Sequence, residues 1–581
     1  MNNLFKIIIF LNIFIFSFEN ILSQHLPNFL SYAERAEMPF YLSRTNFNGF
    51  VIPPSSPVRA VAEWEEMDAI VISWKNYEEE LTEIVRNAVE ELNVYIVCAD
   101  SNYVKNHLII ENVDLENVIY IQEASNSVWI RDFGPNNIYS NETDSLFYVD
   151  WIYNRPRPND DIIPEVMANI SDIPLYQNTV YPYRMVSTGG NFFTDGLGTA
   201  FSSKLVLDEN SNGSYGQNLT ESDIDTIMKK FMGIERYIKL ENLPYDLIHH
   251  IDMHMKLIDE ETLLVGEYPQ GVADGPQIEE NLSYILENFN SVFGTSYKIV
   301  RIPMPPDNYG AYPDNYGWYW TYTNSLIINK TVLVPIYDCE TDEEALNIYR
   351  NEMKGYNIVG INCREPIKAS GAIHCITHEL ATKDPLLISH QELNNVNFSE
   401  TVEFKAKIIH RTGIAQAKVH FKTSLEEEFS NVIDMYLEDE ENNIWNGTLA
   451  ITTKSVDTLH YYIEAIANSG KTQNRPITAP DGYWSAEIEN SSNNLSLNKE
   501  KFANIYYFEK KLNINFELEN SEFTKITLYD VFGKKIKNIN NGILQKGKHN
   551  FTFENKNLRN GVYFIIINNN KFDFSRKIIF F

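Results

Sequence analysis

The chain has 581 residues, of which 44% are hydrophobic and 13% aromatic, so it has enough apolar material to fold into several domains. Its formal net charge of −31 repels nucleic acid and anionic membrane surfaces, which argues against both as partners. Four cysteines in so long a chain do not make a disulfide framework, and their spacing matches no CxxC zinc pattern.

The first residues have the layout of an export signal. Lys6 precedes an apolar run over residues 7–18, and small residues follow near Ser23. The run is too short for a membrane span, and no later apolar run reaches that length. We therefore expect a signal peptide at 1–23 and a removable pro-segment at 24–45. The mature protein is then secreted or attached to the cell surface, without a stable membrane span.

An α/β region follows a linker at residues 53–57, which reads Pro-Pro-Ser-Ser-Pro. From about residue 60 to 390, short β-rich runs alternate with helical runs, and this predicts an α/β domain, placed at 46–390. We expect strands at 68–74, 93–99, 118–124, 146–153, 200–207, 247–258, 262–268 and 326–337, and helices at 78–92, 222–233, 278–294 and 342–355. No glycine-rich phosphate-binding loop follows the first strand, so we expect no nucleotide site.

Two further regions have only β-strand patterns. Short strands recur at regular intervals over 391–488, which is typical of a β-sandwich of the immunoglobulin-like kind. A polar linker at 489–502 separates this sandwich from the last segment, 503–581, where strands alternate with Gly and Asn turns. The sequence therefore predicts a second, C-terminal β-sandwich.

Three polar and aromatic stretches within the α/β region hold candidate functional residues: SVWIRDFGP at 127–135, LIHHIDMHMKLI at 247–258 and KASGAIHCITHEL at 368–380. A strand over the second stretch would place His250, Asp252 and His254 on one face, because strand side chains alternate with period two. Polar groups in a row on an apolar strand must meet water or one another. In the third stretch, Gly371 lets the backbone turn close to Cys375.

These stretches supply one thiol, several histidines and the two carboxylates of Asp132 and Asp252. A thiolate is a nucleophile, and a histidine can protonate a leaving group and later activate water. Two carboxylates flanking one pocket repel each other unless a cation lies between them, and a planar guanidinium fits that place. The set suits attack on a guanidinium carbon with ammonia as the leaving group.

The histidines also permit a metal site, at His374 with His378 or at His250 with His254. In a strand, residues four apart share a face but stand about 13 Å apart, so shared ligation would need a helix. We therefore expect no metal site, and the sequence specifies no structural cation. An ordinary buried thiol is the remaining alternative for Cys375, because free cysteine is among the most buried residue types.

Five stretches occur in the order found in the agmatine deiminase and Porphyromonas-type peptidylarginine deiminase family: VWIRDFGP, TGGNFFTDGLGTAFSS, HHIDMHMKLI, YTNSLIINKTVLVP and SGAIHCITHELA. The chain resembles this family over about residues 60–390. The resemblance implies a five-fold pseudosymmetric β/α propeller, the pentein fold, and a hydrolase that needs no organic cofactor. The chain departs from the family at His254, where an aromatic residue, usually Trp, is expected.

The resemblance also implies roles for individual residues. Cys375 would be the nucleophile that forms an amidino-thioether, and His250 would be the general acid and then the base for water. Asp132 and Asp252 would hold the guanidinium nitrogens, Trp129 would pack on the substrate side chain, and Asn324 would contact the substrate backbone. His374 and His378 are expected only to shape the loop around the nucleophile.

The substrate is suggested by the stretch DWIYNRPRPNDD at 150–161, in which Arg155 and Arg157 point the same way if the chain is extended. Two nearby cations make a carboxylate receptor, although a solvated basic turn has the same pattern. Agmatine has no carboxylate and carries a cationic amine, which two arginines would repel. The resemblance to the peptidylarginine deiminases implies that this motif binds the carboxylate of a C-terminal arginine. Peptides and proteins are therefore favoured as substrates.

The C-terminal segment contains YDVFGKK, KGKHNFTF and LRNGVYFII in this order and resembles the sorting domain of type IX secretion cargo. This implies the type IX secretion machinery as a partner, and a second adhesive sandwich is the alternative. For the whole chain, two other functions stay open: an agmatine deiminase that feeds putrescine and polyamine synthesis, and an exported adhesin with an inactive deiminase domain. Intact Cys375, His250, Asp132 and Asp252 argue against the adhesin.

Overall fold

The computed structural model describes residues 26–41, 49–394, 396–397, 401–451, 458–489, 503–508, 511–518, 522–530, 534–554, 561–569 and 573–580. The predicted signal peptide and nearly all of the predicted linker at 489–502 lie outside these residues. The chain divides into two compact units, of which the first contains the α/β region and most of the following sandwich, and the second contains the C-terminal strands.

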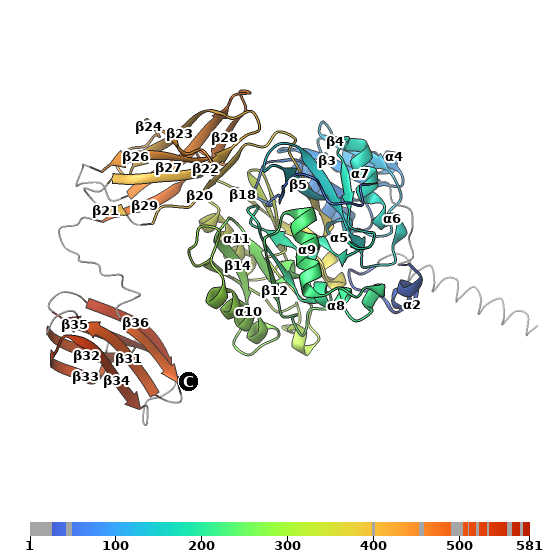
Figure 1. Ribbon diagram of the computed structural model, residues 1–581. Helices are drawn as coiled ribbons and strands as arrows, with labels where there is room; N and C mark the ends of the chain where they lie inside the picture. Colours follow the sequence, from blue (N-terminus) through green and yellow to red (C-terminus); the bar gives the residue numbers. More distant parts are fainter. Residues whose placement is uncertain are drawn as a thin grey trace, which may run out of the picture. The chain divides into compact units, whose positions relative to one another are not determined.

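Five small sheets form the α/β region (Figure 1). Their strands, in spatial order, are β1 (Val58–Ala60), β5 (Asn136–Ser140), β6 (Leu146–Asp150) and β8 (Leu175–Gln177); β10 (Phe193–Thr194), β11 (Thr199–Ser203) and β12 (Arg236–Leu240); β13 (Met255–Leu257), β14 (Thr262–Glu267) and β15 (Lys298–Pro303); β16 (Leu326–Ile328), β17 (Thr331–Ile336) and β18 (Asn357–Asn362); and β19 (His378–Ala381), β2 (Met67–Ser73), β3 (Asn93–Cys98) and β4 (Val118–Gln122). Two short strands, β7 (Ile152–Tyr153) and β9 (Val186–Ser187), pair separately.

The five sheets share one pattern. In each, a central strand (β6, β11, β14, β17 or β2) has an antiparallel neighbour on one side and a parallel neighbour on the other. A parallel neighbour needs a crossover, and each crossover here contains a helix. The fifth sheet joins distant parts of the chain, because β19 pairs with β2. The α/β class is confirmed.

The helices of this unit are α2 (Tyr32–Tyr41), α3 (Glu78–Ala88), α4 (Ser101–Ile110), α5 (Ile130–Phe133), α6 (Pro158–Asp161), α7 (Ile163–Ser171), α8 (Leu205–Asn210), α9 (Glu221–Met232), α10 (Gly275–Asn288) and α11 (Asp342–Glu352). Local chemistry sets their ends. Helix α9 begins with a capping box between Thr220 and Asp223 and ends at Gly233, whose φ of 71° suits glycine. Its buried Ile224, Ile227, Met228 and Phe231 recur at helical spacing and pack into one apolar cluster.

Three expected strands are wrong in part. The stretch 247–258 is a strand only at β13, and a 3-10 turn, η3 (Ile251–Met253), precedes it. The stretch 200–207 changes from β11 to helix α8, and 326–337 is the β16–β17 hairpin with Asn329 at positive φ. Alternation alone cannot separate a strand from a short turn that follows the same polar pattern.

The remaining strands of the sandwich region are β20 (Leu387–His390), β21 (Val396–Asn397), β22 (Thr401–Ile409), β23 (Ile414–Thr423), β24 (Asn431–Asp434), β25 (Tyr436–Asp439), β26 (Ile444–Ala450), β27 (Thr458–Ala467), β28 (Thr472–Arg475) and β29 (Trp484–Glu489). Strands β20, β22, β26 and β25 form one sheet in this order, and β23 lies between β24 and β27 in another. The assignment of this region, 391–488, to an immunoglobulin-like sandwich stays a prediction.

The C-terminal unit has two antiparallel sheets around its own apolar core. The first sheet consists of β30 (Ala503–Phe508), β31 (Lys511–Leu518) and β34 (Gly547–Glu554). The second consists of β33 (Lys535–Leu544), β32 (Glu522–Asp530), β35 (Gly561–Asn569) and β36 (Asp573–Phe580).

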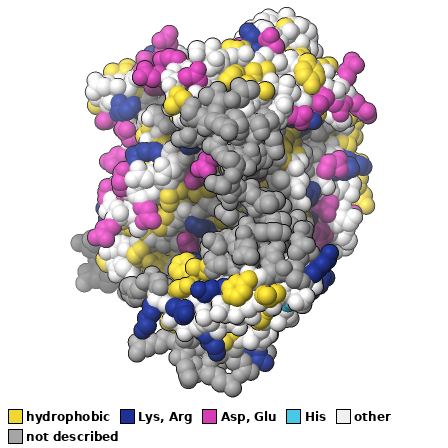
Figure 2. All heavy atoms as spheres, turned by 90° about the vertical axis from the view of Figure 1, so that its left-hand side faces the viewer, with side chains coloured by type: hydrophobic (Ala, Val, Ile, Leu, Met, Phe, Trp, Pro, Cys, Tyr) yellow, Lys and Arg dark blue, Asp and Glu magenta, His cyan; other side chains and the backbone are white. Residues whose placement is uncertain are grey.

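Figure 2 shows one face of the molecule, on which Asp and Glu side chains lie in several separate places among Lys and Arg. None of the helices in the described residues is both long and apolar enough to cross a membrane.

Candidate active site

Asp132, His250 and Asp252 converge at Gly190. Asp132 lies on the short helix α5, His250 directly precedes η3, and Asp252 lies within it. A Cβ atom placed on Gly190 would stand 2.5 Å from His250 Nδ1, 2.9 Å from Asp132 Oδ1 and 3.3 Å from Asp252 Oδ2. Three polar atoms from two segments, α5 and the η3 stretch, therefore surround one point. Glycine at position 190 leaves that point free of a side chain.

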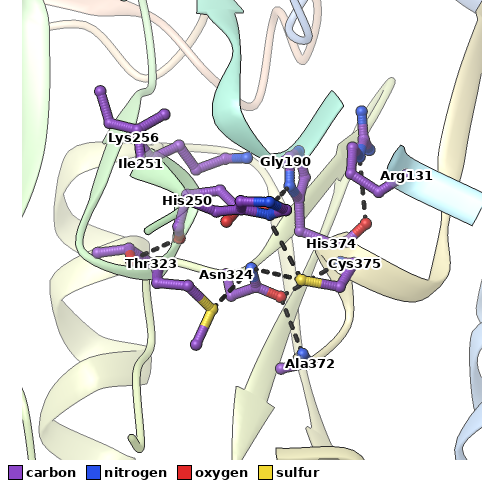
Figure 3. Close-up of polar contacts among 12 residues, drawn as sticks. Arg131, Gly190, His250, Ile251, Lys256, Thr323, Asn324, Ala372, His374 and Cys375 are labelled. Carbon is purple, nitrogen blue, oxygen red and sulfur yellow. Dashed lines mark hydrogen bonds and ion pairs between the residues drawn. The ribbon is translucent and has the colours of Figure 1, made fainter. Parts of the chain in front are cut away.

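The thiol of Cys375 faces the same carboxylate. Cys375 lies on a 3-10 turn, η6 (His374–Ile376), and its Sγ is 3.7 Å from Asp252 Oδ2. Asn324 Nδ2 donates a hydrogen bond to this Sγ at 3.3 Å, while Asn324 Oδ1 accepts from the backbone of Ala372 and Cys375 (Figure 3). Asn324 therefore fixes both the loop and the thiol. Its predicted contact with the substrate backbone stays a prediction.

Several buried polar atoms here have no hydrogen-bond partner among the described residues: Asp132 Oδ2, Asp252 Oδ1 and His250 Nδ1. All three side chains are almost completely buried. Leaving a buried acceptor unpaired costs about 1–3 kcal/mol, and more for a charged one, so two such carboxylate oxygens point to a ligand that donates to both. A guanidinium has five donors in a planar fork and supplies the positive charge that the pair lacks.

Burial and charge set the protonation of the reacting groups. Burial, with the negative charges of Asp252 and Asp132, raises the pKa of the Cys375 thiol well above its usual value. Burial lowers the pKa of His250, although Asp132 and Asp252 oppose this shift. The resting pair is therefore a thiol and a neutral imidazole. A guanidinium bound between the carboxylates would cancel their charge and make the thiolate easier to form.

This charge balance predicts a reagent-dependent pH profile for alkylation of Cys375. Iodoacetamide, which is neutral, should react slowly at neutral pH and faster as pH rises, because the thiol pKa is raised. Chloroacetamidine carries a cationic amidinium that fits between the carboxylates, so its reaction should exceed that of iodoacetamide and extend to lower pH. Mass spectrometry of the peptide containing Cys375 measures both rates. Equal pH profiles for the two reagents would contradict this electrostatic account.

His374 contacts the site through its ring, a role that its sequence pattern did not predict. Its Nδ1 lies 2.8 Å from Asp252 Oδ2, and its Nε2 lies 3.2 Å from Glu63 Oε2. Burial alone would raise the pKa of Asp252, but the hydrogen bond and charge of His374, together with the charges of His250 and Arg131, outweigh burial and lower it. Glu63, the last residue in this row of contacts, also forms an ion pair of 2.6 Å with Lys256. The network keeps Asp252 ionised.

Replacing His374 with asparagine should therefore move the acidic limb of the activity profile to higher pH. Without the ring, the pKa of Asp252 rises, and its protonation, which removes an acceptor for the guanidinium, sets in at a higher pH. A hydrogen bond to a charged group contributes about 1.5–3 kcal/mol, which corresponds to about one to two pH units. The pH profile of kcat/KM measures this shift. His378→Asn is the control, because its ring binds the Pro135 carbonyl instead of a carboxylate.

Trp129, Arg155 and Arg157 contact the N-terminal segment, residues 26–41. The Trp129 indole N–H donates to the Leu26 carbonyl at 2.8 Å. Arg155 donates from Nε and Nη2 to the Asn28 carbonyl at 2.9 and 2.7 Å. Arg157 forms an ion pair of 2.7 Å with Glu34 and donates to the Pro27 carbonyl at 2.6 Å. Both guanidinium groups are thus bound to oxygen atoms of a peptide.

The structure brings together Cys375, His250, Asp132, Asp252 and Asn324, and their catalytic roles stay predictions. A Cβ atom placed on Gly371 would stand 2.5 Å from Trp129 and 3.1 Å from Cys375 Sγ. His254 is buried beyond η3, where burial lowers its pKa to about 4, and neither ring nitrogen has a partner among the described residues. Four residues that contact the site were not predicted from the sequence: Thr188, Gly190, His374 and Glu63. The Thr188 hydroxyl is 3.1 Å from His250 Nε2. Thr188 and Gly190 lie in the TGG stretch, which was the one sequence signal that could have pointed to them.

Within the described part of the chain, no group of three or more His, Cys, Asp or Glu residues is arranged to hold a metal ion. All four cysteines are free thiols. The groups that meet at Gly190 and Cys375 are a thiol, an imidazole and two carboxylates. Such a set suits hydrolysis of a guanidino C–N bond.

Residues 59–380 match the protein family described as Porphyromonas-type peptidyl-arginine deiminase, and the chain belongs to this family. It is a hydrolase of guanidino C–N bonds, and deiminases of this family need no cofactor. Residues 508–580 match the secretion system C-terminal sorting domain, so the chain also carries a type IX sorting domain. This domain connects it with a bacterial secretion system.

The chain is also similar to curated relatives and to solved structures. A protein of Yersinia pseudotuberculosis named "Putative agmatine deiminase" is 26% identical over 293 residues, which cover 45% of this chain and 77% of the relative. A structure described as "Putative Arginine Deiminase from Porphyromonas gingivalis" is 22% identical, with a TM-score of 0.49, and the match covers 56% of this chain and 99% of that one. Another, described as "putative agmatine deiminase", is 19% identical with a TM-score of 0.51, and the match covers 58% of this chain and 100% of that one. The similarity to this last structure concerns the fold alone.

Proposed function

We propose that the protein is a protein-arginine deiminase that converts C-terminal arginine of peptides and proteins to citrulline and ammonia. The observation that carries this proposal is the pair Arg155 and Arg157. Both are buried beside the site, and both bind oxygen atoms of a peptide segment, Asn28 O and the Glu34 carboxylate. A receptor with two guanidinium groups fits the terminal carboxylate of a peptide. It does not fit the cationic amine of agmatine.

Binding places the substrate guanidinium between Asp132 and Asp252, whose free oxygens accept its N–H groups. Trp129 packs against the aliphatic part of the arginine side chain, in the space bounded by Gly371. The carboxylate lies at Arg155 and Arg157. These contacts hold the guanidinium carbon at the Cys375 thiol, and this positioning removes much of the entropic cost of the reaction.

The chemistry follows in two displacements. Cys375 Sγ attacks the guanidinium carbon and forms a C–S bond. The thiol proton passes through His250 to a terminal nitrogen, which leaves as ammonia, and a cationic amidino-thioether remains. Water, deprotonated by His250, then attacks the same carbon, the C–S bond breaks, and the sulfur regains a proton. The product is the ureido group of citrulline, and the extra proton leaves with ammonia as ammonium.

Agmatine is the second candidate substrate, because the curated relatives are named for it. One assay separates the candidates. Formation of the ureido product is measured for a peptide with C-terminal arginine, for the same peptide as its C-terminal amide, and for agmatine. We expect the first substrate to have the highest kcat/KM. Preference for agmatine would overturn the peptide proposal, and no product from any substrate would favour a binding protein with an inactive site.

We also propose that the five sheets form a five-fold pseudosymmetric propeller around the site. The repeated strand order and the β19–β2 pairing support this arrangement. The sorting domain supports secretion or attachment to the cell surface, with removal of the predicted signal peptide at 1–23. Contact with the type IX secretion machinery is the partner that this domain suggests.

A further inference from the structure

Residues 26–41 occupy the entrance that the proposed function assigns to the peptide substrate. Their carbonyl groups accept hydrogen bonds from Trp129, Arg155 and Arg157, the three residues proposed to bind substrate outside the guanidinium. The segment also reaches the nucleophile loop. Asn28 donates from its backbone N to Ala369 O at 2.9 Å and from Nδ2 to Ser370 O at 3.3 Å.

With the segment in place, the site is closed to solvent. Trp129, His250 and Cys375 have no exposed surface, and Arg157 is 1% exposed. A substrate arginine cannot reach the thiol through residues that are fully covered. The segment must therefore leave before a peptide can bind.

The segment copies the oxygen atoms of the expected ligand. The Asn28 carbonyl takes both hydrogen bonds that Arg155 would donate to a terminal carboxylate. Glu34 supplies a carboxylate to Arg157, and despite its burial the pKa of Glu34 is lowered by that arginine. The segment places no guanidinium between Asp132 and Asp252, whose outer oxygens stay without partners among the described residues. It therefore blocks the site without being a substrate.

The helix that carries Glu34 is only partly buried. Helix α2, dark blue in Figure 1, contacts the turn η2 (Ser214–Gly216), and its other face is in solvent, with Tyr32 95% exposed and Arg35, Ala36 and Glu37 also exposed. Such a short helix is marginal by itself, so its attachment depends on the contacts at the site and on its covalent connection. A tethered ligand has an effective concentration near millimolar, which is lost once the tether is cut.

We propose that residues 26–41 are an intramolecular competitive inhibitor, which keeps the deiminase latent until a protease hydrolyses the chain between this segment and the α/β domain. This inference rests on the proposed function, because it assumes that Arg155 and Arg157 are the substrate's carboxylate receptor. Cleavage consumes one water and one peptide bond and changes nothing in the site itself. The freed segment then exchanges with peptide substrate.

The test is a full chain in which a recognition sequence for a specific protease replaces residues 42–48. Alkylation of Cys375 by chloroacetamidine, followed by mass spectrometry, reports access to the site without any need for turnover. We expect the rate to rise about tenfold or more after cleavage and dilution. Cys339, which lies outside the site, is the internal reference. Added peptide 26–41 should slow alkylation again, and the same peptide with Glu34→Gln should do so less.

A matched pair of variants tests the contact in the uncut chain. Glu34→Gln leaves Arg157 buried without its carboxylate, which is strongly unfavourable, so alkylation of Cys375 should accelerate on the order of tenfold. Glu37→Gln makes the same change on the exposed face of the same helix and should leave the rate unchanged. Circular dichroism shows whether both variants keep the fold.

The outcomes separate this inference from the proposed function. Equal alkylation before and after cleavage, with no effect of Glu34→Gln, would overturn latency even if the enzyme forms citrulline. Faster alkylation after cleavage with no turnover of any arginine substrate would retain the inhibitory segment and overturn the deiminase proposal. Inhibition by peptide 26–41 that is competitive with the C-terminal-arginine peptide supports both.

Discussion

Replacing Cys375 with serine should reduce citrulline formation by a factor on the order of 10⁴ or more, because the attacking atom is lost. A serine hydroxyl is far less acidic than a thiol, and the negative charges of Asp132 and Asp252 oppose an alkoxide even more than a thiolate. Substrate should still bind, since neither the carboxylates nor the arginines change. Wild type and variant are compared after removal of residues 26–41, with citrulline as the readout.

Cys98→Ser is the matched control for this change. Cys98 is also buried, but it lies at the end of β3, outside the site. We expect its activity to stay within about twofold of wild type, as for a substitution that does not touch the site. Rapid quenching of wild type with substrate should also yield an amidino adduct on the peptide that contains Cys375. Full activity of Cys375→Ser would exclude Cys375 as the nucleophile.

Replacing Arg155 with alanine should lower kcat/KM for a peptide with C-terminal arginine about 10- to 100-fold, mainly through KM. The variant loses the two hydrogen bonds that the Asn28 carbonyl now accepts, and hydrogen bonds to a charged group contribute about 1.5–3 kcal/mol. Turnover of agmatine, which has no carboxylate, should be unchanged or faster. Steady-state kinetics with both substrates measure this difference after removal of residues 26–41, which would otherwise also lose their contact with Arg155.

Two controls accompany Arg155→Ala. Arg301→Ala removes an arginine from an ion pair with Glu279 at the surface and should change neither substrate's kinetics. The C-terminal amide of the peptide tests the same contact from the substrate side, so wild type should handle the amide as Arg155→Ala handles the acid. Equal kcat/KM for acid and amide in wild type would show that Arg155 does not recognise a carboxylate.

The candidate residues were predictable because their chemistry is local. A thiol beside a glycine turn, an Arg-Asp pair and a His-x-Asp pair each have a recognisable composition, and their order along the chain matches the family. The expected geometry was wrong in one place. His250 and Asp252 do not share a strand face with His254; they converge because η3 turns the chain before β13 begins.

Other features depended on segments that are far apart in the sequence. The contact of His374 with Glu63 joins residues 311 positions apart through the pairing of β19 with β2, and no local pattern encodes it. The same is true of Arg157 and Glu34, which lie on segments separated by 123 positions. The pro-segment could be suggested from its place in the chain, but its contacts with the arginines could not.

The amino-acid sequence alone therefore predicted the alternation of strands and helices, the candidate reacting groups and the family, since these depend on periodicity and on residue types at short spacing. The tertiary structure decided which polar groups meet, which carboxylate atoms stay without partners, and that residues 26–41 cover the site. Those outcomes depend on burial and on distances between remote segments. The same burial sets the protonation of Cys375 and His250, because desolvation acts only once the chain has folded.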